Sequence, residues 1–219
     1  MLETRSLDVS IAGTPILRGA TLAIRPGTTV GLIGRNGAGK TTFMRAVMGL
    51  LPYDGGDVLL SNEAVTAEPA HTRAQRGVGY MPEDRRLIPE FSVEDNILLP
   101  IRALGNDIDR ARLDWVYDLM PEIARFADRK ALALSGGQQK LVALARALIV
   151  GRKLLMLDEP FEGVAPALAQ RLIEVIAALR GEGLSVLLSE SDQVHSSGLL
   201  DDLFVIERGE IEKRTVKTA

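Results

Sequence analysis

Residues 34–41, GRNGAGKT, fit the pattern G-x-x-x-x-G-K-[ST], whose chemistry is the binding of phosphate groups. Gly37 and Gly39 carry no Cβ, so the backbone can turn its N–H groups inward around a di- or triphosphate. Lys40 brings a positive charge to the terminal phosphates, and the hydroxyl of Thr41 suits Mg²⁺. This segment predicts a nucleotide site, with contacts from Gly34, Asn36, Gly37, Ala38, Gly39, Lys40, Thr41 and Thr42.

Two acidic residues follow an apolar run much later in the chain. Residues 154–157, LLML, have the character of a buried parallel strand, which leads directly into Asp158 and Glu159. A carboxylate at the end of such a strand is what a phosphate-loop ATPase places on the far side of its magnesium ion, so we expect Asp158 to hold Mg²⁺. Glu159 is expected to act as the catalytic base that accepts a proton from the water attacking the γ-phosphate.

A second segment with glycines and a serine, LSGGQQ at 134–139, has two interpretations. It can be a helix cap, because Ser135 and Gln138 have the spacing of a capping box. It can also form a second anion-binding nest at a helix start. One chain with two phosphate-binding helix ends, and one nucleotide for each loop, indicates that the second end contacts a nucleotide held by a partner.

Several elements must position these residues. Strands are expected at 29–33, 77–81, 154–157 and 184–188, with a helix after Lys40 that stops near Leu51 and another that begins at Pro166. Their alternating order predicts a parallel sheet covered by helices. A strand pair within 7–24 and a strand at 58–60 predict a small antiparallel sheet, and 203–211 a closing hairpin. The pattern is helical from Glu83 to about Val150.

Length and composition set limits on the function. The 219 residues allow one α/β domain, 1–219, with a helical subdomain at about 84–150. The net charge of −3 gives no electrostatic support for a nucleic-acid partner, and the arginines at 73, 76, 85 and 86 are expected to lie on a solvated face. No cysteine is present for a disulfide or thiolate metal site. There is no apolar run of 18 residues, so any membrane span is expected from another chain.

From Leu7 to about Lys213 the chain resembles the nucleotide-binding domains of ABC transporters, through LSGGQ together with the phosphate loop. The resemblance implies a P-loop NTPase core with a small antiparallel β subdomain and an inserted helical subdomain. It also implies ATP and Mg²⁺ as ligands and a head-to-tail dimer with a second ABC ATPase subunit, identical or different. Segment 162–165 would cross the dimer interface. The residues acting on the partner's nucleotide would be Ser135, Gly136, Gly137 and Gln138.

Within that family, MPEDRRLIPEFSVEDNI, LSGGQQKLVALARAL and DEPFEGVAP look most like the smaller ATPase of branched-chain (hydrophobic) amino acid importers. This likeness implies separate permease subunits, indirect cooperation with a solute-binding protein, and a peripheral location at the cytoplasmic face of the inner membrane. Relatives that carry urea or short amides are a similar match. Transported solute is chosen by permease and binding protein, so the sequence leaves the cargo open.

The sequence departs from the family pattern at three positions. Glu83 replaces the Q-loop glutamine and would hold Mg²⁺ or its water while signalling to a permease. Ser191 stands at the position of the switch histidine, where it can hydrogen-bond the γ-phosphate without adding positive charge. Ala12 replaces the aromatic residue that stacks on adenine, which leaves adenine to Ile11 or another apolar side chain and weakens the base preference.

Three functions are compatible with these features. The first is an active ATPase that drives import through separate permeases. The second is a weakly hydrolytic regulatory ABC domain paired with an active partner, which Ser191 and Ala12 favour. The third, an ABC ATPase of DNA repair or translation, is disfavoured because coiled-coil insertions, zinc cysteines and a second fused cassette are absent from this sequence.

Overall fold

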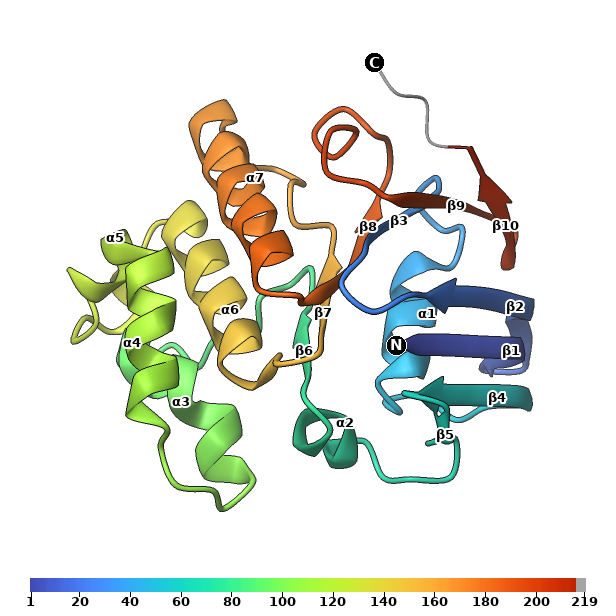
Figure 1. Cartoon of the computed structure of the whole chain (residues 1–219), viewed down its shortest axis with the longest axis horizontal. Helices are drawn as coiled ribbons and strands as arrows, with labels where there is room; N and C mark the ends of the chain where they lie inside the picture. Colours follow the sequence, from blue (N-terminus) through green and yellow to red (C-terminus); the bar gives the residue numbers. More distant parts are fainter. Residues whose placement is uncertain (216–219) are drawn as a thin grey trace.

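Two β-sheets enclose one helix, and further helices cover the outer face of the larger sheet (Figure 1). This arrangement comes from a computed structural model that describes residues 1–215. The smaller sheet has the order β2-β1-β4-β5 and is antiparallel throughout, as the sequence predicts. Its strands are β1 (Leu2–Ile11), β2 (Thr14–Ile24), β4 (Gly55–Leu60) and β5 (Glu63–Ala64).

The larger sheet has the order β10-β9-β3-β8-β7-β6. Five strands are parallel, and β10 closes one edge as the antiparallel arm of the predicted hairpin. The strands are β3 (Thr29–Ile33), β6 (Val78–Met81), β7 (Leu154–Asp158), β8 (Ser185–Glu190), β9 (Asp202–Glu207) and β10 (Glu210–Arg214). The predicted parallel sheet is therefore confirmed.

Side chains along these central strands alternate between two hydrophobic cores. In β7, Leu154 and Met156 pack toward the smaller sheet, whereas Leu155 and Leu157 pack toward the outer helices. Successive side chains of a strand point to opposite faces, so a strand covered on both faces needs an uninterrupted apolar run. This explains why LLML contains no polar residue.

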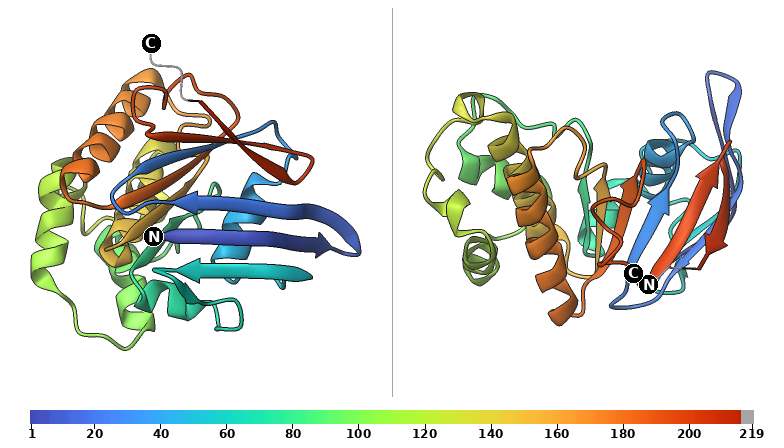
Figure 2. Two further views of the ribbon diagram at one scale, coloured as in Figure 1. Left: turned by 45° about the vertical axis from the view of Figure 1, so that its right-hand side comes forward. Right: turned by 90° about the horizontal axis from the view of Figure 1, so that it is seen from above.

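Helix α1 (Lys40–Val47) lies between the two sheets (Figures 1 and 2). Its residues Phe43 and Met44 are completely buried. It ends four residues before the predicted stop near Leu51. Gly49 follows its end with φ of +70°, the left-handed conformation typical of a residue just after a helix. The glycine therefore ends the helix, before Pro52 can do so.

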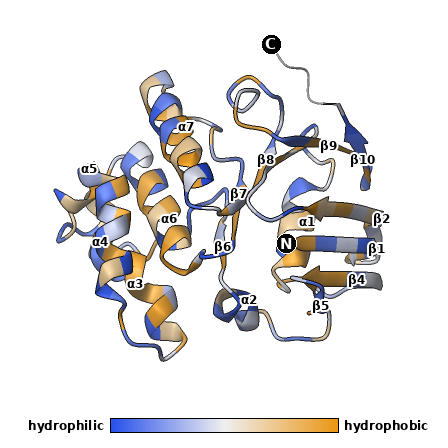
Figure 3. Ribbon diagram, viewed as in Figure 1, coloured by the Kyte–Doolittle hydropathy of each residue, from blue (hydrophilic) through white to orange (hydrophobic). Residues whose placement is uncertain are grey.

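The outer layer contains most of the remaining helices, whose apolar residues are orange in Figure 3. Many of these residues belong to the same hydrophobic core as residues of the larger sheet. The layer consists of α3 (Val93–Ala103), α4 (Arg110–Leu119), α5 (Pro121–Ala124), the 3₁₀ turn η1 (Ala131–Ala133), α6 (Gly136–Val150) and α7 (Pro166–Gly181). Pro166 occupies the first turn of α7, as predicted. In residues 1–215, no helix is both long and apolar enough to span a membrane.

The loop between β6 and α3 differs from the sequence expectation. The pattern is helical from Glu83, but the first helix of this region begins at Val93, capped by Ser92. Arg85 and Arg86 both have positive φ, which interrupts any helix at this point. Their carbonyl oxygens accept hydrogen bonds from the guanidinium group of Arg146 on α6.

One of the four arginines expected on a solvated face is instead buried. Arg73, in the short helix α2 (His71–Gln75), is completely buried. Its guanidinium donates to the carbonyl oxygens of Val47 (3.2 Å) and Glu68 (3.0 Å). A buried charge needs such partners. Arg73 therefore ties the end of α1 to the segment that precedes β6.

Candidate active site

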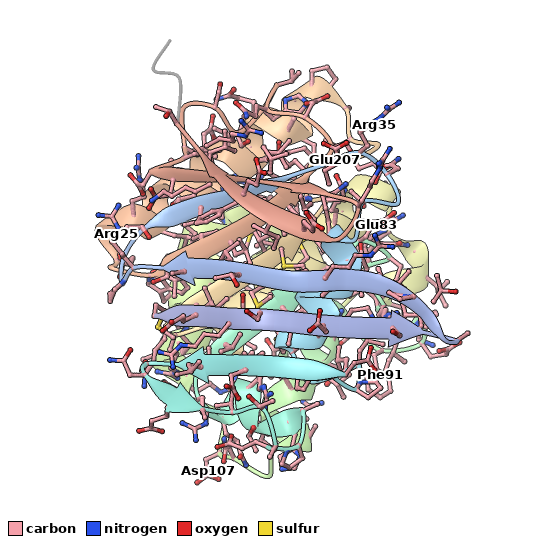
Figure 4. All side chains as sticks on the ribbon, turned by 90° about the vertical axis from the view of Figure 1, so that its right-hand side faces the viewer. Arg25, Arg35, Glu83, Phe91, Asp107 and Glu207 are labelled. Carbon is pink, nitrogen blue, oxygen red and sulfur yellow. The ribbon has the colours of Figure 1, made fainter. Side chains whose placement is uncertain are left out.

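The predicted site residues gather where the parallel strands end. Because β3, β6, β7 and β8 run in the same direction, their carboxyl ends meet at one edge of the sheet. Figure 4 labels Arg35, after β3, and Glu83, after β6, at one end of the molecule, with Arg25, before β3, at the opposite end. This edge is where ligands bind in open α/β sheets.

The phosphate loop links β3 to α1 and lines a cleft of about 450 Å³. Gly37 and Gly39 have φ of +82° and +113°, conformations that side chains strain to adopt. A Cβ on Gly34 would lie only 2.5 Å from the carbonyl oxygen of Ile206, so that position also needs glycine. Lining the cleft are Ile16, Asn36, Gly37, Gly39, Lys40, Thr41, Thr42, Glu83, Glu159 and Glu162.

Lys40 is the first residue of α1 and is 94% buried in this cleft. Its Nζ donates to the carbonyl oxygens of Gly34 and Arg35, and lies 2.9 Å from Oε1 of Glu159. The start of a helix also carries unpaired N–H groups and the positive end of its dipole. The lysine and the helix start together form a positive, donor-rich lining suited to phosphate.

Asp158 is completely buried at the end of β7 and is held by three hydroxyl groups. Its Oδ1 accepts from Ser189 at 2.6 Å and lies 3.3 Å from Oγ1 of Thr41, and its Oδ2 accepts from Tyr80 at 3.2 Å. Burial raises the pKa of this carboxyl group, and the hydroxyls act in the opposite direction. Asp158 therefore lies within hydrogen-bond distance of the other predicted metal ligand, Thr41, which lines the cleft.

Glu159 turns back toward the phosphate loop because its φ is +49°, the left-handed conformation. Its N–H donates to the carbonyl oxygen (3.1 Å) and hydroxyl (3.2 Å) of Ser189. Its Oε1, besides contacting Lys40, lies 3.1 Å from the hydroxyl of Ser191, which is also 2.8 Å from Oδ1 of Asn36. The structure therefore brings both predicted catalytic residues, Glu159 and Ser191, to the phosphate loop.

Glu83 reaches the same cleft from the loop after β6. The pKa of its carboxyl group is raised by partial burial and by the negative charges of Glu162, Asp158 and Glu159. No three His, Cys, Asp or Glu side chains within 1–215 form a dedicated metal site. The donor set of Thr41 and Asp158, with Glu83 nearby, instead fits Mg²⁺, which takes few protein ligands and completes its shell with water and phosphate.

Ser135 to Gln138 lie at the start of α6, and Ser135 to Gly137 border a second cleft, of about 460 Å³. Ser135 is the N-cap, and its reciprocal hydrogen bonds with Gln138 (3.2 and 3.0 Å) complete the capping box. The cap leaves the exposed glycine backbone at the helix start accessible, so the two interpretations of this segment are compatible. The side chains or backbone lining this cleft come from Glu83, Arg85, Ser135, Gly136, Gly137, Lys140, Glu162, Gly163, Val164, Ala165 and Leu168.

The remaining predicted contacts lie around the first cleft. Gly34 and Ala38 border a hollow behind the phosphate loop, which Ser191 also lines. Ala12 sits exposed in the β1–β2 turn with φ of +49°, and is not among the residues lining the 450 Å³ cleft. Ile16 on β2 does line the cleft and offers an apolar side chain that a nucleotide base can contact.

Sequence patterns did not single out Ile16, Tyr80, Ser189 or Lys140. For Tyr80 and Ser189 a signal existed, because both lie at the ends of predicted parallel strands whose neighbour ends in Asp158. The position of Ile16 in the cleft depends on how far β2 extends past the phosphate loop. The contacts of Lys140 depend on which side of α6 faces the loop after β7. Neither feature is visible in the local sequence.

Comparisons with known proteins agree on the type of domain. Residues 17–162 match the family model described as ABC transporter. The chain is 32% identical over 212 residues to the lipopolysaccharide export system ATP-binding protein LptB of Escherichia coli K12, covering 96% of this chain and 88% of LptB. It is 33% identical over 195 residues to the high-affinity branched-chain amino acid transport ATP-binding protein BraG of Pseudomonas aeruginosa, covering 89% and 84%.

A solved dimeric structure of a bacterial ABC transporter cassette has the same fold, with a TM-score of 0.88, 22% identity and full coverage of both chains.

Proposed function

Because the chain belongs to the ABC transporter family of ATP-binding domains and is an ABC ATPase, we propose that it hydrolyses ATP at a dimer interface to drive solute uptake through separate permeases. The observation that carries the proposal is that Lys40, Thr41 and Glu159 line one cleft, while Asp158 lies within hydrogen-bond distance of Thr41. Phosphate binding, metal binding and base chemistry are then provided around one triphosphate by the start of α1 and by the end of β7 with the residue that follows it.

The roles follow from the contacts. Lys40 and the N–H groups of the phosphate loop bind the β- and γ-phosphates. Thr41 and Asp158 hold Mg²⁺, with Glu83 beside them, and the ion when bound neutralises developing negative charge on the phosphates. Glu159 accepts the proton of the attacking water, and Ser191 hydrogen-bonds the γ-phosphate. Ile16 contacts the base in place of a stacked aromatic ring.

Dimerisation supplies the other half of each cleft in this proposal. Ser135, Gly136, Gly137 and Gln138 form a helix start, yet Ser135 to Gly137 border a cleft separate from the one that contains Lys40. We infer that they contact the nucleotide of a second ABC subunit, identical or related, whose own helix start completes the Lys40 cleft. The dimeric form of the bacterial cassette of the same fold supports this arrangement.

The cargo we propose is a branched-chain or other hydrophobic amino acid, delivered by a solute-binding protein to permeases at whose cytoplasmic face this subunit binds. The likeness to BraG supports it. A second candidate is an export system, because the identity to LptB is nearly equal and covers more of both chains. The two differ in the permease, which decides direction and cargo.

Two experiments test the proposal. Steady-state phosphate release should fall about 10²- to 10⁴-fold in Glu159→Gln, the loss expected for a general base, while the exposed control Glu210→Gln keeps the wild-type rate. Full activity of Glu159→Gln would exclude the catalytic role. Reconstitution in vesicles with amino acid permeases, followed by leucine uptake, tests the cargo; stimulation only by lipid-exporting permeases would support the second candidate.

A further inference from the structure

Lys140 is a buried lysine outside the phosphate loop, and its ammonium group donates hydrogen bonds to backbone carbonyl groups. It lies on α6 with 5% of its surface exposed. Its Nζ donates to the carbonyl oxygens of Glu159 at 3.0 Å and Glu162 at 2.7 Å. Burying an ammonium group costs free energy unless hydrogen-bond acceptors are fixed around it. Through these two hydrogen bonds Lys140 links α6 to the loop from Glu159 to Glu162.

The loop that Lys140 holds also determines where the base points. Glu159 has the left-handed backbone conformation, with its N–H fixed by Ser189, its carbonyl by Lys140 and its carboxylate beside Lys40. Rotation of the peptide that follows Glu159 would move its carboxylate relative to the phosphate loop. Lys140 supplies one of the bonds that prevent this rotation.

The same helix begins at the segment proposed to bind the partner's nucleotide. Gly136 and Lys140 are four residues apart, so they lie on one face of α6, a single turn from each other. The carbonyl of Gly136 also accepts a hydrogen bond from Arg85 at 3.1 Å. The start of α6 is therefore connected both to the loop of Glu83 and, through Lys140, to the loop of Glu159.

We propose that Lys140 is a positioning residue that couples the nucleotide at the start of α6 to the general base Glu159 of the neighbouring cleft. This inference rests on the proposed function. A phosphate that binds Ser135 and Gly136 fixes the first turn of α6, and a helix is stiff over one turn, so the ammonium group and the Glu159 carbonyl are fixed with it. Each subunit would then hydrolyse efficiently only when its partner's nucleotide is in place.

The test is a double-mutant cycle between Lys140 and Glu159. Lys140→Met keeps the length and apolar stem but removes the donors, and should lower kcat about 10- to 100-fold, as a misplaced base does, with unchanged binding of a fluorescent ADP analogue. Lys140→Arg, which keeps the charge and donors, should restore most of the rate. The exposed Lys153→Met makes the same chemical change elsewhere and should leave kcat unchanged.

The decisive comparison is in the Glu159→Gln background. There Lys140→Met should lower the residual rate by less than about threefold, because the carboxylate it positions has been removed. A purely structural lysine would lower the rate by the same factor in both backgrounds, and that result would overturn the inference, as would a wild-type kcat in Lys140→Met. If Lys140→Met does not fold, Lys140→Gln, whose amide is too short to reach both carbonyls, carries the same expectations. Full activity of Glu159→Gln itself would instead refute the proposed function.

Discussion

The Nζ of Lys40 lies 2.9 Å from Oε1 of Glu159, and more than 90% of each side chain is buried. This ion pair joins the start of α1 to the residue that follows β7. A triphosphate in the cleft would compete with Glu159 for the ammonium group, because both are anions that the same lysine can reach. Nucleotide binding would thereby release the carboxylate to accept a proton from water.

Removing Lys40 should affect both stability and binding. Lys40→Met leaves the Glu159 carboxylate buried without its cation, so we expect the free energy of unfolding to fall by about 3 kcal/mol in urea denaturation. Lys40→Met/Glu159→Gln should recover part of this loss, since the uncompensated charge is gone. ATP binding measured by calorimetry should be lost in both variants. Equal instability of the single and double variants would contradict the ion-pair account.

Ser191 should contribute modestly to turnover. Its hydroxyl carries one proton and no positive charge, and it lies within 3.1 Å of both Asn36 and Glu159. Ser191→Ala should therefore lower kcat by about 2- to 10-fold, the loss of one hydrogen bond. A loss above 100-fold in steady-state phosphate release would show that Ser191 acts as a full substitute for a catalytic histidine.

Base selectivity should be weak. Ile16 offers an apolar surface but no stacked ring, and Ala12 does not line the cleft. The ratio of kcat/KM for ATP and GTP should lie within about threefold of one, because an aromatic stack adds only about 0.5–1.5 kcal/mol. Competition assays with both nucleotides measure this ratio. A preference for ATP above 30-fold would point to a base contact other than Ile16.

Stability should fall with pH above about 5 because of Glu190. This residue is 4% exposed, its Oε2 accepts from Ser196 at 3.0 Å, and burial with the charges of Glu159 and Asp192 raises its pKa from 4.5 to about 8. Between these values the native state binds a proton that the unfolded state has lost. The contribution of Glu190 to the free energy of unfolding is therefore fully present below pH 4.5. It is lost as the pH rises to about 8, by up to about 1.4 kcal/mol per pH unit.

Glu190→Gln should remove this slope, as urea denaturation at pH 5, 6, 7 and 8 can show, whereas the exposed Glu210→Gln should keep it. Equal slopes in wild type and Glu190→Gln would mean that Glu190 stays ionised when buried.

Local sequence patterns predicted the parts of the fold that depend on burial periodicity and turn chemistry. The apolar runs at 29–33 and 154–157 form β3 and β7, which lie on either side of β8 in one sheet, and Pro166 begins α7. Where tertiary contacts decide, the prediction for Arg73 was wrong: it is buried, and the carbonyl oxygens of Val47 and Glu68 accept hydrogen bonds from its guanidinium group. Contacts such as Lys140 to Glu159 join distant segments and leave no local pattern.

The central claim is that each nucleotide lies between two subunits. A structure of Glu159→Gln bound to Mg²⁺ and ATP tests it directly, because this variant should bind nucleotide and turn it over slowly. We predict that Lys40 of one subunit and the Ser135 hydroxyl of the other both lie about 3 Å from oxygens of the γ-phosphate. A triphosphate enclosed by a single subunit, or one that Lys40 does not touch, would contradict the account.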